Sequence, residues 1–211
     1  MEDSSTSAQT RAWASQRNGN HEGAKESSRA RILDAAQRLF VEQGYKGLSM
    51  REIAQAVGVS KPALYHYFTD KEDLFLAILG SYLDDMEVVL ANARAASPTQ
   101  IDCLRTIVRD ILQQPIEQRA ILRLASVEMV HISEAARVRF HERYVAQFLG
   151  PIGAVIGAGM TSGEFRTVDP ALATWALLGI LYPYFSSSSP PPTDAIIEQV
   201  INLPVDDYLC I

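Results

Sequence analysis

Two side chains in the second half of the sequence, Glu128 and His131, have the types and the spacing for acid–base chemistry. Three residues apart on a helix, a carboxylate and an imidazole lie on one face, where they could share a proton or hold a metal ion. No third metal ligand and no nucleophile follows at a recognisable spacing. A surface pair is therefore the preferred interpretation, and no catalytic residue, metal site or cofactor is predicted. A small helical enzyme that uses Glu128 and His131 stays open as an alternative function.

A second group of reactive side chains lies in residues 60–68, where the sequence is Ser-Lys-Pro-Ala-Leu-Tyr-His-Tyr-Phe. On a helix, Leu64 and Phe68 are four residues apart and face one side, which leaves the lysine, both tyrosines and the histidine on the outside. Exposed aromatic rings beside a lysine suit contacts to phosphates, sugars and base edges better than they suit a protein core. This helix is therefore a candidate nucleic-acid contact.

The charge of the chain is divided unevenly along its 211 residues. The net charge is −6, but residues 1–71 hold 10 Lys and Arg against 8 Asp and Glu, which gives +2, and the remainder carries −8. All four lysines lie in the first third of the chain. An anionic partner is therefore expected at the N-terminal part, although chance variation of the surface explains the asymmetry equally well.

The elements that position residues 60–68 are marked by helix start and stop signals. The segment Ser49-Met-Arg-Glu52 is a capping box, Gly58 ends the short helix that it opens, and Ser60 caps the next one. Thr69-Asp-Lys-Glu72 has the spacing of a second capping box and is expected to open a long helix. Two short helices joined by the turn Val57-Gly58-Val59 predict a helix-turn-helix, in which the second helix enters the major groove of DNA.

The run from Gly44 to Leu74 resembles the DNA-binding domain of the TetR family of transcriptional regulators. The resemblance rests on both caps, the turn, and the segment Leu64-Tyr65-x-Tyr67-Phe68-x-x-Lys71. It implies an all-α fold, in which an N-terminal three-helix helix-turn-helix domain precedes a larger helical ligand-binding and dimerisation domain. Pro62 departs from the family pattern, which often has a small residue at this position. The proline removes one backbone N–H that could have donated to a phosphate. Carried over position by position, the DNA contacts implied by the resemblance fall on Ser49, Arg51, Ser60, Lys61, Ala63, Tyr65, His66 and Lys71.

The rest of the chain also has apolar residues at helical spacing and shows no sustained alternation, so the whole protein is predicted to be all-α. Three regions are expected: a flexible arm over 1–26, the helix-turn-helix domain over 27–72, and the effector-binding and dimerisation domain over 73–211. No apolar run is long enough to cross a bilayer and no signal peptide is visible, so a cytoplasmic protein without a membrane partner is expected.

An apolar pocket is expected in the larger domain, between the helices of residues 71–93 and 135–162. An apolar or aromatic small molecule is the predicted effector. For any single apolar residue at helical spacing, however, a place in the hydrophobic core is the more frequent explanation than a place in a pocket. Arginines at positions 105, 109, 119 and 123 are interpreted as a solvated face rather than as an anion site. The residues proposed to line the pocket are Tyr82, Met86, Ile107, Phe140, Tyr144, Phe148 and Trp175.

The last two helices, over 169–185 and 193–203, are unusually apolar for the edge of a domain. The resemblance implies a homodimer through a four-helix bundle that these helices form, which places two reading helices about 34–36 Å apart on a palindromic operator. The function predicted from the sequence is a ligand-responsive, sequence-specific regulator of transcription, most readily a repressor. A non-specific architectural DNA binder remains a further alternative.

Overall fold

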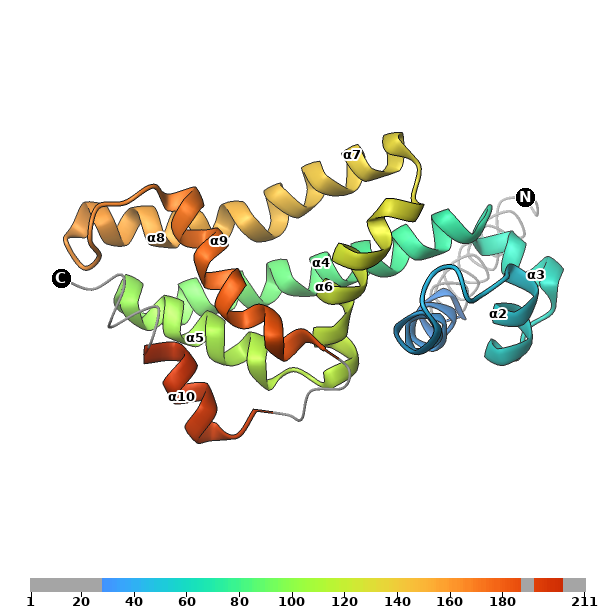
Figure 1. Ribbon diagram of the computed structural model, residues 1–211, viewed down its shortest axis with the longest axis horizontal. Coiled ribbons are helices and arrows are strands. Elements are labelled where there is room, and N and C mark those ends of the chain that lie inside the picture. Colours follow the sequence, from blue (N-terminus) through green and yellow to red (C-terminus); the bar gives the residue numbers. More distant parts are fainter. Residues whose placement is uncertain (1–27, 187–191, 203–211) are drawn as a thin grey trace, which may run out of the picture.

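The structure, a computed structural model, describes residues 28–186 and 192–202, and every regular element within these ranges is helical (Figure 1). The N-terminal head, residues 28–67, lies at one end of the molecule, and the C-terminal bundle, residues 97–202, makes up the other (Figure 1). The all-α prediction is confirmed for this part of the chain. The predicted arm over 1–26 lies outside the described residues.

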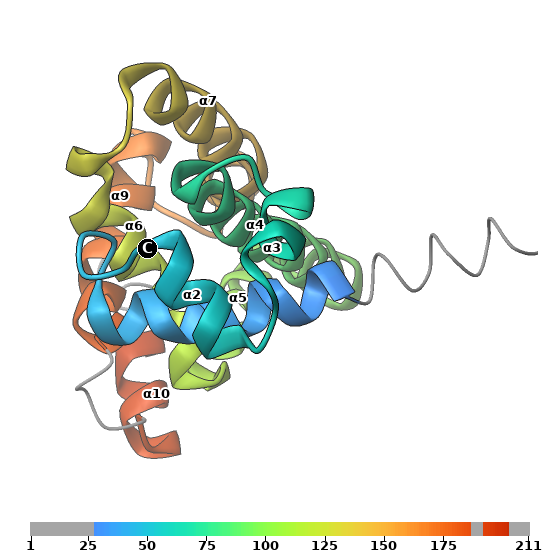
Figure 2. The ribbon, with the colours of Figure 1, turned by 90° about the vertical axis from the view of Figure 1, so that its right-hand side faces the viewer.

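Three helices form the N-terminal head: residues 28–43, α2 (Met50–Val57) and α3 (Lys61–Tyr67). The first helix ends at Gly44, whose φ of 73° lies in the left-handed region that glycine adopts without strain. The three helices bury a compact set of apolar side chains, and Figure 2 shows the head in front of the bundle. Its most buried members are Ile32, Ala36, Phe40, Ile53, Leu64 and Phe68.

The long helix α4 (Lys71–Ala96) leaves the head and runs into the bundle (Figure 1). The capping box predicted at Thr69 is wrong by one residue. Asp70 is the N-cap and accepts from the backbone N–H of Asp73 at 2.8 Å, while the Asp73 carboxylate accepts from both the backbone N–H and the hydroxyl of Thr69. A carboxylate caps a helix as well as a hydroxyl does, so Thr69 and Asp70 were both candidates for the N-cap. Glu72 is thereby left free for a contact elsewhere.

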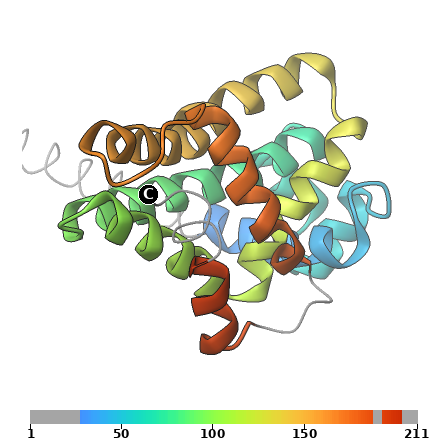
Figure 3. The ribbon, with the colours of Figure 1, turned by 60° about the vertical axis from the view of Figure 1, so that its left-hand side comes forward.

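The C-terminal bundle packs around α4 and contains the remaining helices (Figure 3). α8 lies against α5 and α9, and α10 packs on α5, so the predicted last helix covers the edge of the bundle. The elements are α5 (Gln100–Gln113), α6 (Ile116–Glu128), η1 (Met129–His131), α7 (Glu134–Tyr144), η2 (Val145–Leu149), α8 (Gly150–Ser162), α9 (Pro170–Leu181), η3 (Tyr182–Phe185) and α10 (Asp194–Asn202).

A π-helical turn, η2, joins α7 to α8. Pro151 has no backbone N–H, so the ordinary i→i−4 pattern is interrupted there, and the N–H of Gly150 bonds to the carbonyl of Val145, five residues earlier. The continuous helix of residues 134–162 is long and apolar enough, by length and composition alone, to cross a membrane. In this fold its apolar side chains supply the bundle core, where Phe148 and Ile152 are completely buried.

A single buried apolar cluster runs from the N-terminal head through α4 into the C-terminal bundle. α4 contributes to both ends of it, since Leu74 and Phe75 pack in the head and Leu83 and Met86 pack in the bundle. The predicted division at residues 72 and 73 therefore falls inside the first turn of α4. The head and the bundle are mechanically joined rather than separated by a linker.

Candidate nucleic-acid interface

The turn between α2 and α3 sets the geometry of the candidate interface. Ser49 closes a capping box with Glu52, because its hydroxyl accepts from the Glu52 N–H at 3.3 Å while the Glu52 carboxylate accepts from the Ser49 N–H at 2.8 Å. The Ser49 hydroxyl also donates to the Glu52 carboxylate at 2.6 Å, and this hydrogen bond, together with the one from the Ser49 N–H, holds the pKa of the Glu52 carboxyl below its usual range. Gly58 ends α2 with a φ of 77°, and its N–H bonds to Gln55. The predicted helix-turn-helix is confirmed in its caps and its turn.

α3 divides into a buried and an open face as its sequence predicts. Leu64 and Phe68 are 0% and 1% exposed, whereas Lys61, Tyr65 and His66 are exposed. The Lys61 ammonium lies 5.6 Å from the centre of the Tyr65 ring, one helical turn away, so the two side chains occupy one patch. An accessible cation and a phenol hydroxyl on a short, open helix can reach a phosphate oxygen together.

Three positions near this face differ from the simplest expectation. Tyr67 was expected to point outward, but it is half-buried and its ring lies 6.5 Å from that of Phe68. Ala63 is also half-buried, at the edge of the exposed patch. Lys46 was not among the predicted contacts, yet it is exposed in the loop that leads to Ser49. Its position just before a helix N-terminus was the available signal, since phosphates bind there.

Lys71 has a more internal position than the sequence suggested. Its ammonium donates to the backbone carbonyls of Tyr45 and Leu48, both at 2.8 Å, and lies 4.2 Å from the Tyr45 ring centre. Partial burial lowers the pKa of Lys71, and the charge of Glu128 works in the opposite direction. An ammonium has three N–H donors, so one remains for a phosphate while the other two fix the loop before α2.

The side chains predicted to line an effector pocket fill the core of the bundle. Tyr82, Met86, Ile107 and Phe148 are each 2% exposed or less. Phe140 and Tyr144 are half-buried, and the rings of Phe140, Tyr144 and Phe148 stack in a row with centres 6.0 and 5.5 Å apart. Burial raises the pKa of Tyr144 to about 12. These residues are brought together as predicted, but as packed side chains of α4, α5, α7 and η2.

Trp175 does not belong with this group. Its side chain is 54% exposed on the outer face of α9, so it does not line an interior pocket. The prediction that Trp175 lines the pocket was mistaken. Helical spacing shows which residues share one face of a helix, but it does not show whether the core covers that face. Arg119 is the opposite case: it was interpreted as solvated, but it is 1% exposed and donates to the carbonyls of Gln114 and Tyr184.

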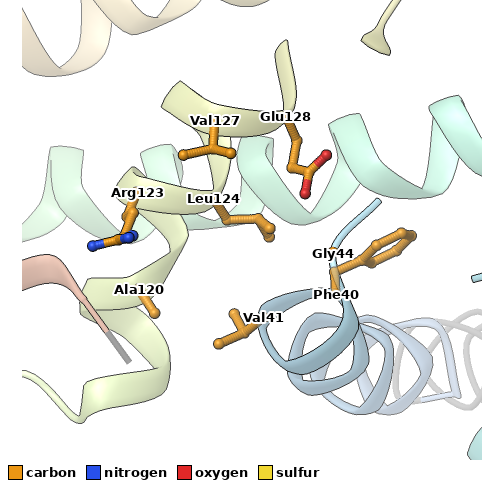
Figure 4. A pocket seen from close by; sticks show the side chains of 8 residues that line it. All are labelled: Phe40, Val41, Gly44, Ala120, Arg123, Leu124, Val127 and Glu128. Carbon is orange, nitrogen blue, oxygen red and sulfur yellow. The ribbon is translucent and has the colours of Figure 1, made fainter. Parts of the chain in front are cut away.

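Glu128 and His131 lie at the junction of the head with α6, where Nε2 of His131 is 3.7 Å from a carboxylate oxygen of Glu128. The Glu128 carboxylate faces Gly44 across a small cavity of about 170 Å³ that Phe40, Val41 and Leu124 help to line (Figure 4). A Cβ added at Gly44 would lie 2.7 Å from a Glu128 oxygen, which shows how closely α6 approaches the head. No group of three metal-ligating side chains occurs within residues 28–186 and 192–202.

Another tie, between the start of α4 and the start of α7, runs through Glu72 in the first turn of α4. Its two carboxylate oxygens accept from the backbone N–H and the hydroxyl of Ser133, at 2.8 and 2.7 Å. Ser133 is itself the N-cap of α7. The start of α7 is therefore fastened to the start of α4.

Comparison with known proteins places this geometry in a family. Residues 32–78, which include α2, α3 and the first helix from residue 32 onward, match the model described as bacterial regulatory proteins, tetR family. The chain is 35% identical over 105 residues to the transcriptional activator FasR of Mycolicibacterium smegmatis, a match that covers 48% of this chain and 47% of FasR. It is 48% identical over 89 residues to the repressor AcnR of Corynebacterium glutamicum, covering 42% and 43%. The chain thus spans about half the length of these relatives.

Two comparisons extend over the bundle as well. The transcriptional repressor KstR2 of Rhodococcus jostii is 24% identical over 186 residues, which cover 86% of this chain and 91% of KstR2. A crystal structure of AibR in complex with isovaleryl coenzyme A and operator DNA is 24% identical, with a TM-score of 0.71 over 86% of this chain and 97% of AibR. The arrangement of the bundle is therefore shared with a regulator that holds a ligand and DNA, and at this identity the likeness concerns the fold.

Proposed function

We propose that this chain, which belongs to the tetR family of bacterial regulatory proteins, is a ligand-responsive, sequence-specific repressor that acts in the cytoplasm as a homodimer. The observation that carries the proposal is the open face of α3, on which Lys61, Tyr65 and His66 are exposed while the opposite face is locked into the head. A major groove about 12 Å wide admits such a helix. Transcriptional regulation as such is common to the relatives described above.

The proposed DNA contacts are those on and around α3. Ser49 and Ser60 lie at helix N-termini, where free backbone N–H groups and the helix dipole favour a phosphate. The side chains of α3 contact base edges and phosphates. Lys46, in the loop before α2, supplies a further cation, and Lys71, at the start of α4, supplies one ammonium N–H. The set comprises Ser49, Arg51, Ser60, Lys61, Ala63, Tyr65, His66 and Lys71, to which we add Lys46.

Ligand response is proposed to work through α4. Because only three residues separate α3 from α4 and α4 continues into the bundle, a ligand that shifts α4 changes the separation of the two heads in a dimer. The operator is then released without any change in the contact residues themselves. Such a ligand acts only through its preference for the released conformation, typically 1–3 kcal/mol. DNA must weaken the binding of the ligand by the same factor.

The first test concerns the electrostatics of α3. Lys61→Ala is expected to weaken binding to every DNA sequence and to flatten the slope of log K against log salt by about one unit, because one phosphate contact is lost. Titrating a fluorescent duplex at several salt concentrations measures this slope. Arg38→Ala removes a cation of the same charge from the head, where it pairs with Asp34 on the first helix, and should leave the slope unchanged. An unaltered slope in Lys61→Ala would remove this lysine from the interface.

A second test concerns the tie between α4 and α7. Glu72→Ala removes both hydrogen bonds to Ser133 but leaves the exposed face of α3 intact. We expect operator affinity without ligand to stay within about threefold of the parent, while the ligand-induced loss of affinity shrinks by a factor of about 5, within the range of measured coupling energies. Asp73→Ala, a carboxylate one residue later that caps α4 locally, is the control. A ligand response in Glu72→Ala equal to that of the parent would show that the hydrogen bonds between Glu72 and Ser133 do not couple ligand binding to DNA binding.

A further inference from the structure

The carboxylate of Glu128, the last residue of α6, is largely buried, and no hydrogen-bond donor within residues 28–186 and 192–202 reaches it. Its side chain is 13% exposed. Nε2 of His131 lies 3.7 Å from one carboxylate oxygen, which is too far for a hydrogen bond. Because buried carboxylates are normally hydrogen-bonded, this group calls for a donor that the described part of the chain does not supply.

Lys71 attracts this carboxylate from the start of α4 but makes its hydrogen bonds elsewhere. Two of its three ammonium N–H groups donate to the carbonyls of Tyr45 and Leu48, both at 2.8 Å. Burial lowers the pKa of Lys71 while the charge of Glu128 raises it, so the two charges interact across the junction of the head with α6. No hydrogen bond joins the two side chains, and the carboxylate therefore remains open to another cation.

Oε1 of Glu128 lies against Gly44, at one end of the cavity of about 170 Å³ between the first helix and α6 (Figure 4). Phe40, Val41 and Gly44 line one side of this cavity, and α6 lines the other with Leu124 and Glu128. Neither carboxylate oxygen is fully buried, so a molecule in the cavity can reach the carboxylate. The cavity lies between the head and the bundle, not between α4 and α7 where the sequence predicted the effector.

We propose that this cavity, which we call the junction cavity, binds a small primary ammonium ion with a short apolar body. The ammonium donates to Oε1 of Glu128, and the body packs between Val41 and Leu124. At roughly 30 Å³ for each non-hydrogen group, the volume holds about six of them. The regulatory meaning of the site rests on the proposed function, but the binding itself does not.

An ammonium is the head group that the charges of the junction cavity favour. A carboxylate would be repelled by Glu128, and a hydroxyl would donate one hydrogen bond but leave the buried charge without a counter-ion. Arg123 lines the other end of the cavity, and its nitrogen atoms point away from Gly44 and Phe40 (Figure 4). The cation of Arg123 is therefore displaced from Oε1. Between the two charges lies the apolar side chain of Leu124, which suits an alkyl body.

Occupation of the junction cavity would act on the loop before α2 through Lys71. An ammonium at Oε1 offsets the negative charge that attracts Lys71 from α6, and Lys71 holds the carbonyls of Tyr45 and Leu48. The same molecule changes the separation of the first helix from α6, which approach each other closely at Gly44. Both changes loosen a loop that precedes the proposed DNA contacts of α2. Operator affinity is therefore expected to fall when the ligand binds.

Binding is tested with three four-carbon probes that differ in the head group: butylammonium, 1-butanol and butanoate. The full-length protein is titrated at constant ionic strength, and the shifts of its backbone amide resonances are followed. Butylammonium is expected to saturate, with shifts centred on residues 40–44 and 120–128. Butanol should bind about tenfold more weakly, because the ionic attraction is lost, and butanoate should not bind. Equal saturation by butanol or by butanoate would overturn the proposal.

Two variants test the head-group contact and the cavity separately. Glu128→Gln keeps the shape of the side chain and removes its charge, so butylammonium should bind about tenfold more weakly and lose its advantage over butanol. Glu142→Gln makes the same change at an exposed carboxylate of α7 and should leave binding unchanged. Ala120→Val adds two methyl groups to the cavity wall and should weaken butylammonium and butanol alike. Unaltered butylammonium binding in Glu128→Gln or in Ala120→Val would refute the site.

Operator binding is measured in parallel, with and without saturating butylammonium at constant ionic strength. The parent is expected to lose about fivefold in operator affinity, within the range of measured coupling energies, and Glu128→Gln should show no such loss. Failure of operator binding with intact, Glu128-dependent butylammonium binding would refute the proposed function alone. Intact operator binding without butylammonium binding would refute only the junction cavity. Operator affinity that is the same with and without bound butylammonium would overturn the regulatory step.

Discussion

Trp175→Asp is expected to convert the proposed homodimer into monomers and to lower operator affinity by about 10³-fold. α9 contains no charged residue, and one face of it packs into the bundle through Ala173, Leu177 and Leu181. The opposite face is apolar and open, with Leu172 67% and Trp175 54% exposed. A helix that is apolar all round is buried on both faces in the functional assembly. An aspartate at its centre would be an unpaired buried charge.

The loss in DNA binding follows from symmetry. Two heads joined by a two-fold axis read two half-sites, and a monomer keeps only one of them, so most of the preference for the operator over other DNA disappears. Sedimentation at micromolar concentration measures the assembly, and Val88→Asp is the matched control, since Val88 is 59% exposed on α4. Gly179→Arg is a second variant: no heavy atom lies within 4 Å of a Cβ at Gly179, so the monomer accommodates the larger side chain. Dimeric Trp175→Asp would assign the open face of α9 to another partner.

The head was predictable because its signals are local. A capping box, a left-handed glycine and a second capped helix within residues 49–68 determine backbone geometry within a few residues, and the structure has each of them. The alternation of buried Leu64 and Phe68 with exposed Lys61 and Tyr65 follows from helical periodicity alone. Thr69 and Asp70 are adjacent and both can cap a helix. The local sequence therefore predicts that a helix begins there, but not at which residue.

The bundle was less predictable, because its site depends on which faces meet. Helical spacing identified Tyr82, Met86 and Phe148 as one set, and they do converge, but it could not tell a packed core from a cavity. It also placed Trp175 inside and Arg119 outside, because helical spacing does not indicate which face of a helix the core covers. The tie between Glu72 and Ser133 and the contact of Gln114 with Met86 join residues 61 and 28 positions apart. Contacts of this kind leave no local pattern.

Arg119→Ala is expected to lower the free energy of unfolding by about 3–5 kcal/mol, the second large effect. The Arg119 guanidinium is 1% exposed and donates to the carbonyl of Gln114, the C-cap of α5, at 3.1 Å and to that of Tyr184 in η3 at 2.6 Å. Both carbonyls lie at helix C-termini, where the dipole favours a cation. Removal leaves two carbonyls without this donor, at about 1–3 kcal/mol each, and a cavity as well.

Chemical denaturation at one fixed protein concentration measures this loss, because the stability of a dimer depends on concentration. Arg123→Ala, one turn later on α6 and exposed, is the matched control and should stay within about 0.5 kcal/mol of the parent. Arg119→Lys should recover only part of the loss, since one ammonium lacks the planar fork that spans two carbonyls. Arg119→Ala with the parent's stability would mean that α5 and η3 are held together by their apolar contacts alone.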